Sequence, residues 1–147
     1  MTPSEKWTKR FLELADTVAS WSRDPSTKVG SVITDSKNRV VSLGFNGFPQ
    51  GVSDDMAAYG QREVRLARTI HAEENALAFA RRDLTNCAIY VTHPPCAHCT
   101  AMIIQSGIAL VVFWEPEEAF ADRWGADLLA SAEMFREAGV TALGWAR

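Results

Sequence analysis

The stretch IALVVFW, residues 108–114, is an unbroken run of apolar residues. Such a run indicates a strand buried on both faces, as the central strands of α/β sheets are. A helix predicted over residues 123–138 follows it and ends at Gly139, and VTALGW, residues 140–145, is predicted to be another strand. A full helix between two strands makes them parallel, with a right-handed crossover. This unit predicts an α/β fold.

The other predicted elements are compatible with that fold. VGSVIT (29–34) and RVVSLGF (39–45) form a predicted β-hairpin around the polar turn DSKN (35–38). We further predict a strand over residues 87–92 and helices over residues 4–21, 61–69, 72–82 and 96–105. Helices and strands alternate after the hairpin, which favours a layered α/β sandwich.

The first predicted helix carries one apolar stripe. Its members recur at steps of four and three residues, and they are Trp7, Phe11, Leu14, Val18 and Trp21. Ser4 is the expected N-cap residue. We expect the whole stripe to pack into the core.

Composition places residues 1–147 in one globular domain. Hydrophobic residues make up 47% and the formal net charge is −3 without a basic block, which argues against a large nucleic-acid partner. No apolar run approaches the roughly 20 residues that cross a bilayer, and the N-terminus lacks the features of a signal peptide. We therefore expect a cytoplasmic protein whose three cysteines bind metal or are buried, with Cys87 a buried one.

The stretch HAEENALAFA, residues 71–80, places two glutamates just after a histidine. On a helix of 3.6 residues per turn, Glu73 falls near the middle of the apolar face, whereas Glu74 falls beside Arg81 on the solvated side. A buried carboxylate costs several kcal/mol unless it is protonated, paired or near a cation. Glu74 is therefore interpreted as a surface acid, and Glu73 as a functional one with a metal as its candidate partner.

The motif P-C-x-x-C supplies two thiolates for such a metal. Cys96 and Cys99 share one face of the first turn of a helix, where free N–H groups and the helix dipole favour thiolates. With His71 they form a donor set that suits zinc and leaves a fourth position for water, as in catalytic sites. A closed structural zinc site would need a fourth ligand, and His93 and His98 are the available side chains.

The combined motif is more specific than either part. His-x-Glu at a helix start, followed about 25 residues later by P-C-x-x-C on the next helix, is the signature of zinc-dependent base deaminases. In that chemistry zinc activates a water that attacks C4 of cytosine or C6 of adenine, while a glutamate that is not a ligand transfers protons. Glu73 is the residue at that position.

Four blocks extend the likeness: SRDPSTKVGSVI, LGFNGFPQGVSDD, HAEENAL and PPCAHCTAMIIQSGI. Over about residues 18 to 112, they resemble the successive blocks of the deoxycytidylate (dCMP) deaminases, within the cytidine/deoxycytidylate deaminase family. The resemblance implies a three-layer α/β/α sandwich with a five-stranded mixed sheet. It also implies zinc-dependent hydrolysis of dCMP to dUMP and ammonia, which supplies dUMP for thymidylate synthesis, one Zn²⁺ per chain, and a homo-oligomer, usually a hexamer.

The resemblance also assigns roles by position. The expected roles are zinc binding by His71, Cys96 and Cys99, proton transfer by Glu73, a hydrogen bond from the Ala72 backbone N–H to the pyrimidine carbonyl, sugar binding by Asn46, phosphate binding by Arg23 and Lys28, and a base wall from Phe113 or Trp114. Plain loop charges are the alternative for Arg23 and Lys28, and core packing is the alternative for Phe113.

Many members have a cysteine where Val52 stands, and some use it for an additional metal. Control by dCTP and dTTP in the family leaves open a Mg²⁺ bound with an effector nucleotide.

Several other functions share parts of this sequence pattern. A tRNA adenosine deaminase should be more basic, and a free-cytidine deaminase usually ends its sheet with a hairpin instead of a helical crossover. The nearest alternative is a deaminase of dCTP, CMP or a 5-modified dCMP, because one Arg and one Lys do not count phosphates. A zinc module that only senses nucleotides would not need Glu73.

Overall fold

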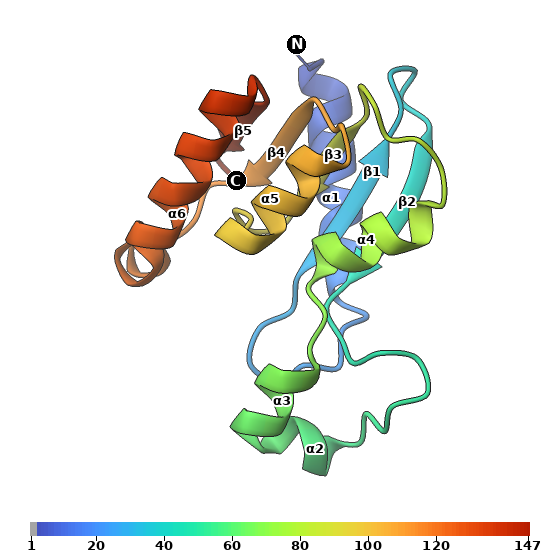
Figure 1. The fold of residues 1–147 in the computed structure, drawn as a ribbon, viewed down its shortest axis with the longest axis vertical. Helices are drawn as coiled ribbons and strands as arrows, with labels where there is room; N and C mark the ends of the chain where they lie inside the picture. The colour runs from blue at the N-terminus through green and yellow to red at the C-terminus, as the bar shows by residue number, and fades with distance from the viewer. Residues whose placement is uncertain (1–2) are drawn as a thin grey trace.

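The computed structural model describes residues 3–147, and its centre is a five-stranded mixed sheet (Figure 1). The strands are β1 (Gly30–Thr34), β2 (Val40–Phe45), β3 (Ala88–Val91), β4 (Leu110–Trp114) and β5 (Thr141–Trp145), in the spatial order β2-β1-β3-β4-β5. β1 pairs antiparallel with β2 and β3, whereas β3, β4 and β5 are parallel. The predicted mixed sheet with parallel last strands is confirmed.

Helices cover both faces of this sheet. The longer helices are α1 (Glu5–Ala19), α4 (Ala72–Ala80), α5 (Ala97–Gln105) and α6 (Glu118–Ala138). α1 packs on one face, α4 and α5 cover the other, and α6 lies beside α5 and β5 (Figure 1). This is the three-layer sandwich that the resemblance implied. Within the described residues, no helix combines the length and apolarity that crossing a membrane requires.

The central strands are buried on both faces because their side chains alternate between two apolar cores. Ile89 and Val111 belong to the core under α4, α5 and α6, which also contains Ile103. Tyr90 and Val112 belong to the core under α1. The apolar run of β4 thus has the central, doubly covered position that its sequence predicted.

Close contacts place the start of α4 on the sheet. A Cβ at Gly44 would collide with the carbonyl oxygen of Ala72, so the absence of a side chain lets the helix approach β2. The Ser31 hydroxyl donates to the Ala72 carbonyl oxygen at 2.8 Å, and the Ser42 hydroxyl donates to the Ala76 carbonyl oxygen at 2.7 Å. These buried hydrogen bonds hold α4 in one orientation, which matters because His71 and Glu73 lie at its start.

The prediction for Trp21 was wrong. Its side chain is 51% exposed, because α1 ends at Ala19 and the chain turns away from the core. The Trp21 ring instead meets Phe45 edge-on, with ring centroids 6.2 Å apart. The other apolar residues of the stripe, from Trp7 to Val18, contribute to the core under α1 or are buried.

Two helical segments also differ from the prediction. α6 begins at Glu118 instead of residue 123, and acidic residues in a first turn suit the helix dipole. The short helix α2 (Met56–Gly60) was not predicted; Asp55 caps it by accepting from the Ala58 N–H at 2.8 Å. With α3 (Arg62–Arg68), α2 forms a small lobe at the bottom of Figure 1.

Candidate metal centre and active-site cavity

The starts of α4 and α5 bring three metal-binding side chains together. His71 is the N-cap residue of α4 and Cys96 is the N-cap residue of α5. His71 Nδ1 lies 3.5 Å from Cys96 Sγ and 3.3 Å from Cys99 Sγ. Among residues 3–147, these three form the only group of at least three His, Cys, Asp or Glu side chains placed to hold one metal ion.

This donor set fits zinc. A nitrogen and a sulfur ligand on one zinc tetrahedron lie about 3.6 Å apart, given bond lengths of about 2.1 and 2.3 Å, and the two observed separations are close to that value. His98 is exposed, and His93 Nδ1 lies 3.1 Å from the Thr92 hydroxyl, so neither joins the group. Three protein ligands without a fourth are typical of catalytic zinc.

One of the two thiols in this group is already a thiolate, the form that binds a metal. The hydrogen bond from the Cys99 thiol, with a further one from His71, lowers the pKa of Cys96 to about 3. The same contact with Cys96, together with burial, raises the pKa of Cys99. The hydrogen bond to Cys96 raises the pKa of His71 to about 9. Zinc bound here would replace the protons of His71 and Cys99.

Glu73 has the buried position that its place on the helical face predicted. Only 5% of the residue is exposed, and this burial raises the pKa of its carboxyl to about 7, while its own backbone N–H and the charge of His71 act in the opposite direction. A carboxyl group with a pKa near the working pH can both accept and return a proton. Its location next to the metal-binding residues is what a proton carrier requires.

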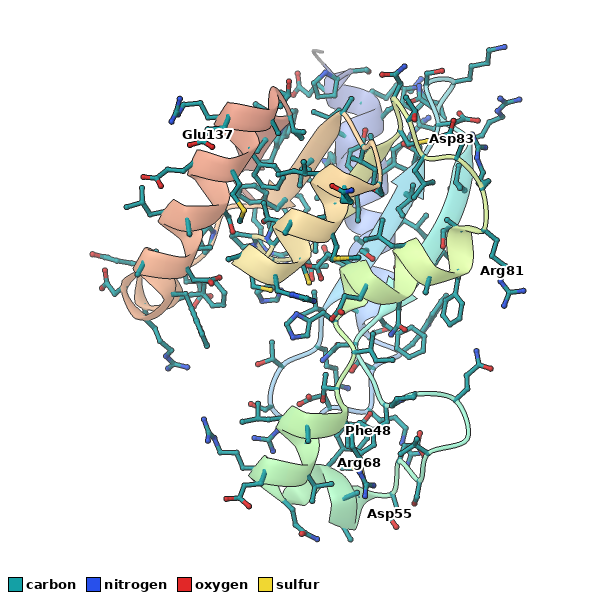
Figure 2. All side chains as sticks on the ribbon, viewed as in Figure 1. Phe48, Asp55, Arg68, Arg81, Asp83 and Glu137 are labelled. Carbon is teal, nitrogen blue, oxygen red and sulfur yellow. The ribbon has the colours of Figure 1, made fainter. Side chains whose placement is uncertain are left out.

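Glu74 has a structural role that the helical-face argument missed. Its Oε1 accepts a hydrogen bond from the His71 backbone N–H at 3.1 Å, as in a capping box. Its Oε2 lies 3.5 Å from His98 Nε2. Glu74 is half-buried, whereas Arg81 lies at the far end of α4 and points away from it (Figure 2). The predicted position of Glu74 beside Arg81 was therefore wrong, and its role as a helix cap was not predicted.

Beside the metal-binding group lies a cavity of about 810 Å³. His71, Ala72, Glu73 and Cys96 line one part of it. Most of the remaining wall comes from the loop 24–29, from α3 and from the first turns of α6. This volume is within the range of small-molecule sites and is large enough for more than a base.

The cavity contains some of the predicted substrate residues. Ala72, Asn46 and Lys28 line it. Asn46 is buried and holds the neighbouring loop, because its Oδ1 accepts from the Val29 N–H at 2.9 Å and its Nδ2 donates to the Thr27 carbonyl oxygen at 2.8 Å. The side chain that is expected to contact the sugar therefore also holds the neighbouring loop in place.

Three other predicted residues lie outside the cavity wall. Arg23 is exposed, and its guanidinium lies 3.6 Å from the Asp54 carboxylate. Phe113 packs against the core under α5, as its alternative role implied, and Trp114 belongs to the core under α1. Neither aromatic residue of β4 forms the wall of this cavity.

Several residues that form the wall were not predicted from the sequence to bind substrate. These are Arg62 and Arg65 on α3, His93 before α5, and Phe120, Arg123 and Trp124 on α6. The rings of Phe120 and His93 lie 5.7 Å apart, and those of Phe120 and Trp124 lie 6.4 Å apart. The steps of three and four between Phe120, Arg123, Trp124 and Asp127 were the available signal, but residues 118–122 were not assigned to a helix.

Comparisons with known proteins agree with this geometry. Residues 5–115 match the family described as cytidine and deoxycytidylate deaminase zinc-binding region. A protein of Aliivibrio fischeri named "uncharacterized deaminase in luxG 3′ region" is 55% identical over 135 residues, covering 92% of this chain and 90% of the relative. The deoxycytidylate deaminase of Homo sapiens is 34% identical over 142 residues, covering 92% of this chain and 78% of the relative.

A solved structure gives the same architecture. The apo crystal structure of the dCMP deaminase from the cyanophage S-TIM5 matches with a TM-score of 0.75, covering 97% of this chain and 100% of the other. The two sequences are 20% identical, so this match supports the fold alone.

Proposed function

Because this chain is a zinc-dependent deaminase of the cytidine and deoxycytidylate deaminase family, we propose that its substrate is dCMP, which it hydrolyses to dUMP and ammonia. The observation that carries the proposal is the buried Glu73 carboxyl beside His71, Cys96 and Cys99, at one end of a cavity that could hold a nucleotide. Two relatives support the choice of dCMP. The deoxycytidylate deaminase of Homo sapiens is 34% identical, and the probable deoxycytidylate deaminase of Caenorhabditis elegans is 38% identical.

The residues divide the chemistry between them. His71, Cys96 and Cys99 would hold Zn²⁺, which when bound makes water a nucleophile near neutral pH. Glu73 accepts a proton as water adds to C4 of the cytosine ring and passes it to ring N3. It then accepts the remaining proton of the added hydroxyl and passes it to the departing amine. The C4–N bond breaks, ammonia leaves, and the oxygen of water becomes the new carbonyl oxygen.

The start of α4 offers a contact for orienting the base. Ala72 is the first residue of the helix, so its backbone N–H has no carbonyl partner within α4. We propose that this N–H donates to the pyrimidine carbonyl. Asn46, which lines the same cavity, is proposed to contact the sugar hydroxyl.

A second candidate substrate class is another cytosine nucleotide, such as dCTP, CMP or a 5-modified dCMP. The cavity volume of about 810 Å³ supports it, because this space would admit groups beyond those of dCMP. The relative that is 55% identical carries a name that specifies a deaminase but no substrate.

A substrate panel separates these possibilities. Zinc-loaded protein is incubated with dCMP, CMP, dCTP, 5-methyl-dCMP and deoxycytidine, and the loss of cytosine absorbance is followed. We expect the largest kcat/KM with dCMP. A larger value with another nucleotide would replace dCMP as the substrate, and no turnover of any cytosine compound would reject the proposed function.

Assembly and regulation are further parts of the proposal. We propose a homo-oligomer, a hexamer by resemblance, with possible effectors dCTP and dTTP and a Mg²⁺ bound with the effector. Val52 is 38% exposed and stands where many family members have a cysteine. Sedimentation velocity, with and without dCTP and Mg²⁺, tests both the oligomer and its response to the effector.

A further inference from the structure

The wall of the cavity away from the metal-binding group is rich in cations. Lys28 comes from the loop before β1, Arg62 and Arg65 come from α3, and Arg123 comes from α6. α3 and the start of α6 belong to separate parts of the fold, so residues far apart in the sequence line the same space (Figure 1). A cavity with clustered cations attracts an anionic ligand group.

The acids in the same wall do not neutralise these cations by direct pairing. Asp24 is occupied by its own loop, since its Oδ1 accepts from the Ser26 N–H at 2.8 Å and the Thr27 N–H at 3.2 Å. Asp127 Oδ2 accepts from the Ala97 N–H at 3.0 Å. Both carboxylates therefore have backbone partners of their own.

The arginines differ in how much of their donor capacity is in use. Within residues 3–147, Arg62 and Arg123 take part in no side-chain hydrogen bond or ion pair. Arg65 uses one guanidinium nitrogen to donate to the Tyr59 carbonyl oxygen at 2.9 Å, which leaves its other donors for a ligand. By contrast, the Arg23 guanidinium already lies 3.6 Å from Asp54.

We propose that Arg62 and Arg65 on α3, together with Arg123 on α6, bind the phosphate of the nucleotide and thereby select a nucleotide over a nucleoside. This inference rests on the proposed function, and it assigns the phosphate to α3 and α6 instead of to Arg23. The planar guanidinium groups suit phosphate oxygens, with which they form paired, charge-assisted hydrogen bonds. With the phosphate there, the base extends along the cavity toward Glu73.

The test compares dCMP with deoxycytidine, which lacks the phosphate. We measure kcat/KM for both substrates with zinc-loaded wild type, Arg62→Ala, Arg123→Ala and the double variant. The dCMP-to-deoxycytidine ratio should fall about tenfold for each single variant and about a hundredfold for the double variant, if the contacts add. Arg62→Lys and Arg123→Lys keep a charge and should restore part of the ratio.

Arg68→Ala is the matched control from the same helix. Arg68 lies against Phe48, 5.9 Å from the ring centre, and does not line the cavity (Figure 2). Its removal should leave the substrate ratio within about twofold of wild type, since surface substitutions have small effects. Circular dichroism melting of every variant identifies any loss of fold.

Each contrary result has a distinct meaning. An unchanged ratio in the Arg62 and Arg123 variants, or a drop in the ratio for Arg23→Ala or Lys28→Ala alone, would overturn the assignment to α3 and α6 while leaving the proposed function intact. Equal losses on both substrates would also overturn it, because the arginines would then shape the cavity instead of binding phosphate. Wild type that turned over no cytosine substrate would reject the proposed function itself.

Discussion

Asp127 Oδ2 accepts a hydrogen bond of 3.0 Å from the backbone N–H of Ala97, and it thereby links α6 to the first turn of α5. Ala97 lies between the two cysteines of the metal-binding motif and immediately follows Cys96. Ser131 on α6 adds a second link, since its hydroxyl donates to the Pro95 carbonyl oxygen at 3.1 Å. α6 therefore fixes the helix start that presents both thiolates.

Asp127→Ala should weaken zinc binding by about 10- to 100-fold, the usual effect of removing a group that orients the ligands. It should also cost about 1 kcal/mol of stability, as the loss of a helix cap does. Competition with a zinc chelator measures the affinity. Asp127→Asn keeps an acceptor oxygen and should retain most of both properties.

The control for that experiment is Asp122→Ala. Asp122 is exposed on the same helix and does not line the cavity. If Asp122→Ala and Asp127→Ala reduced zinc affinity equally, a general effect of negative charge on α6 would explain the loss, and the hydrogen bond to Ala97 would not.

Removing a thiolate should cost zinc, activity and stability together, because metal binding is coupled to folding. We predict this outcome for Cys96→Ser and Cys99→Ser, measured by metal analysis and by melting with and without chelator. Cys87→Ala is the matched control, since Cys87 is buried in the core away from the metal-binding group. Full zinc content in both serine variants would contradict the ligand assignment.

Glu74→Ala should keep most of the deaminase activity and lose about 1 kcal/mol of stability. The reason is that Glu74 accepts from the His71 N–H as a helix cap and is not placed as the proton carrier. Urea unfolding and steady-state kinetics on one preparation measure both effects. An inactive Glu74→Ala that still bound zinc would show that the proton carrier had been assigned to the wrong glutamate.

The free energy of unfolding of the zinc-free protein should depend on pH because Glu73 is buried. Burial raises the pKa of Glu73 from 4.5 to about 7, so the folded state holds a proton that the unfolded state releases. The contribution of Glu73 to stability is therefore fully present below pH 4.5 and is lost as the pH rises toward 7. Between pH 5 and 8, zinc-free Glu73→Gln should gain about 2 to 3 kcal/mol relative to wild type. A difference in unfolding free energy that stays constant over this range would contradict the buried, protonated carboxyl.

Local patterns in the sequence were sufficient to predict the strands and the metal-binding group, whereas the five-stranded mixed sheet was implied by the family resemblance. The apolar run of β4 indicated its burial, and His71, Cys96 and Cys99 are identified by two short motifs at helix starts. Glu73 could be distinguished from Glu74 because one side of a helix must face the core. The capping role of Glu74 could not be predicted in this way, because the apolar face of a helix does not show that the first backbone N–H groups need acceptors.

The cavity wall could not be predicted in the same way. Arg62 and Arg123 approach the cavity only through the packing of α3 and α6, and neither position carries a short motif. Arg23 lies in a block with a strong family resemblance, yet its side chain lies beside Asp54. Long-range placement of flexible charged side chains depends on tertiary structure, which single-sequence patterns do not contain.

The most direct test of the account is the activity of Glu73→Ala on dCMP with zinc still bound. Zinc-loaded wild type and variant are compared by cytosine absorbance, and metal analysis is performed on the same samples. We predict turnover of dCMP by wild type and a loss of at least about 100-fold in kcat for the variant, with one zinc per chain in both. A zinc-loaded Glu73→Ala that deaminated dCMP at close to the wild-type rate would contradict it.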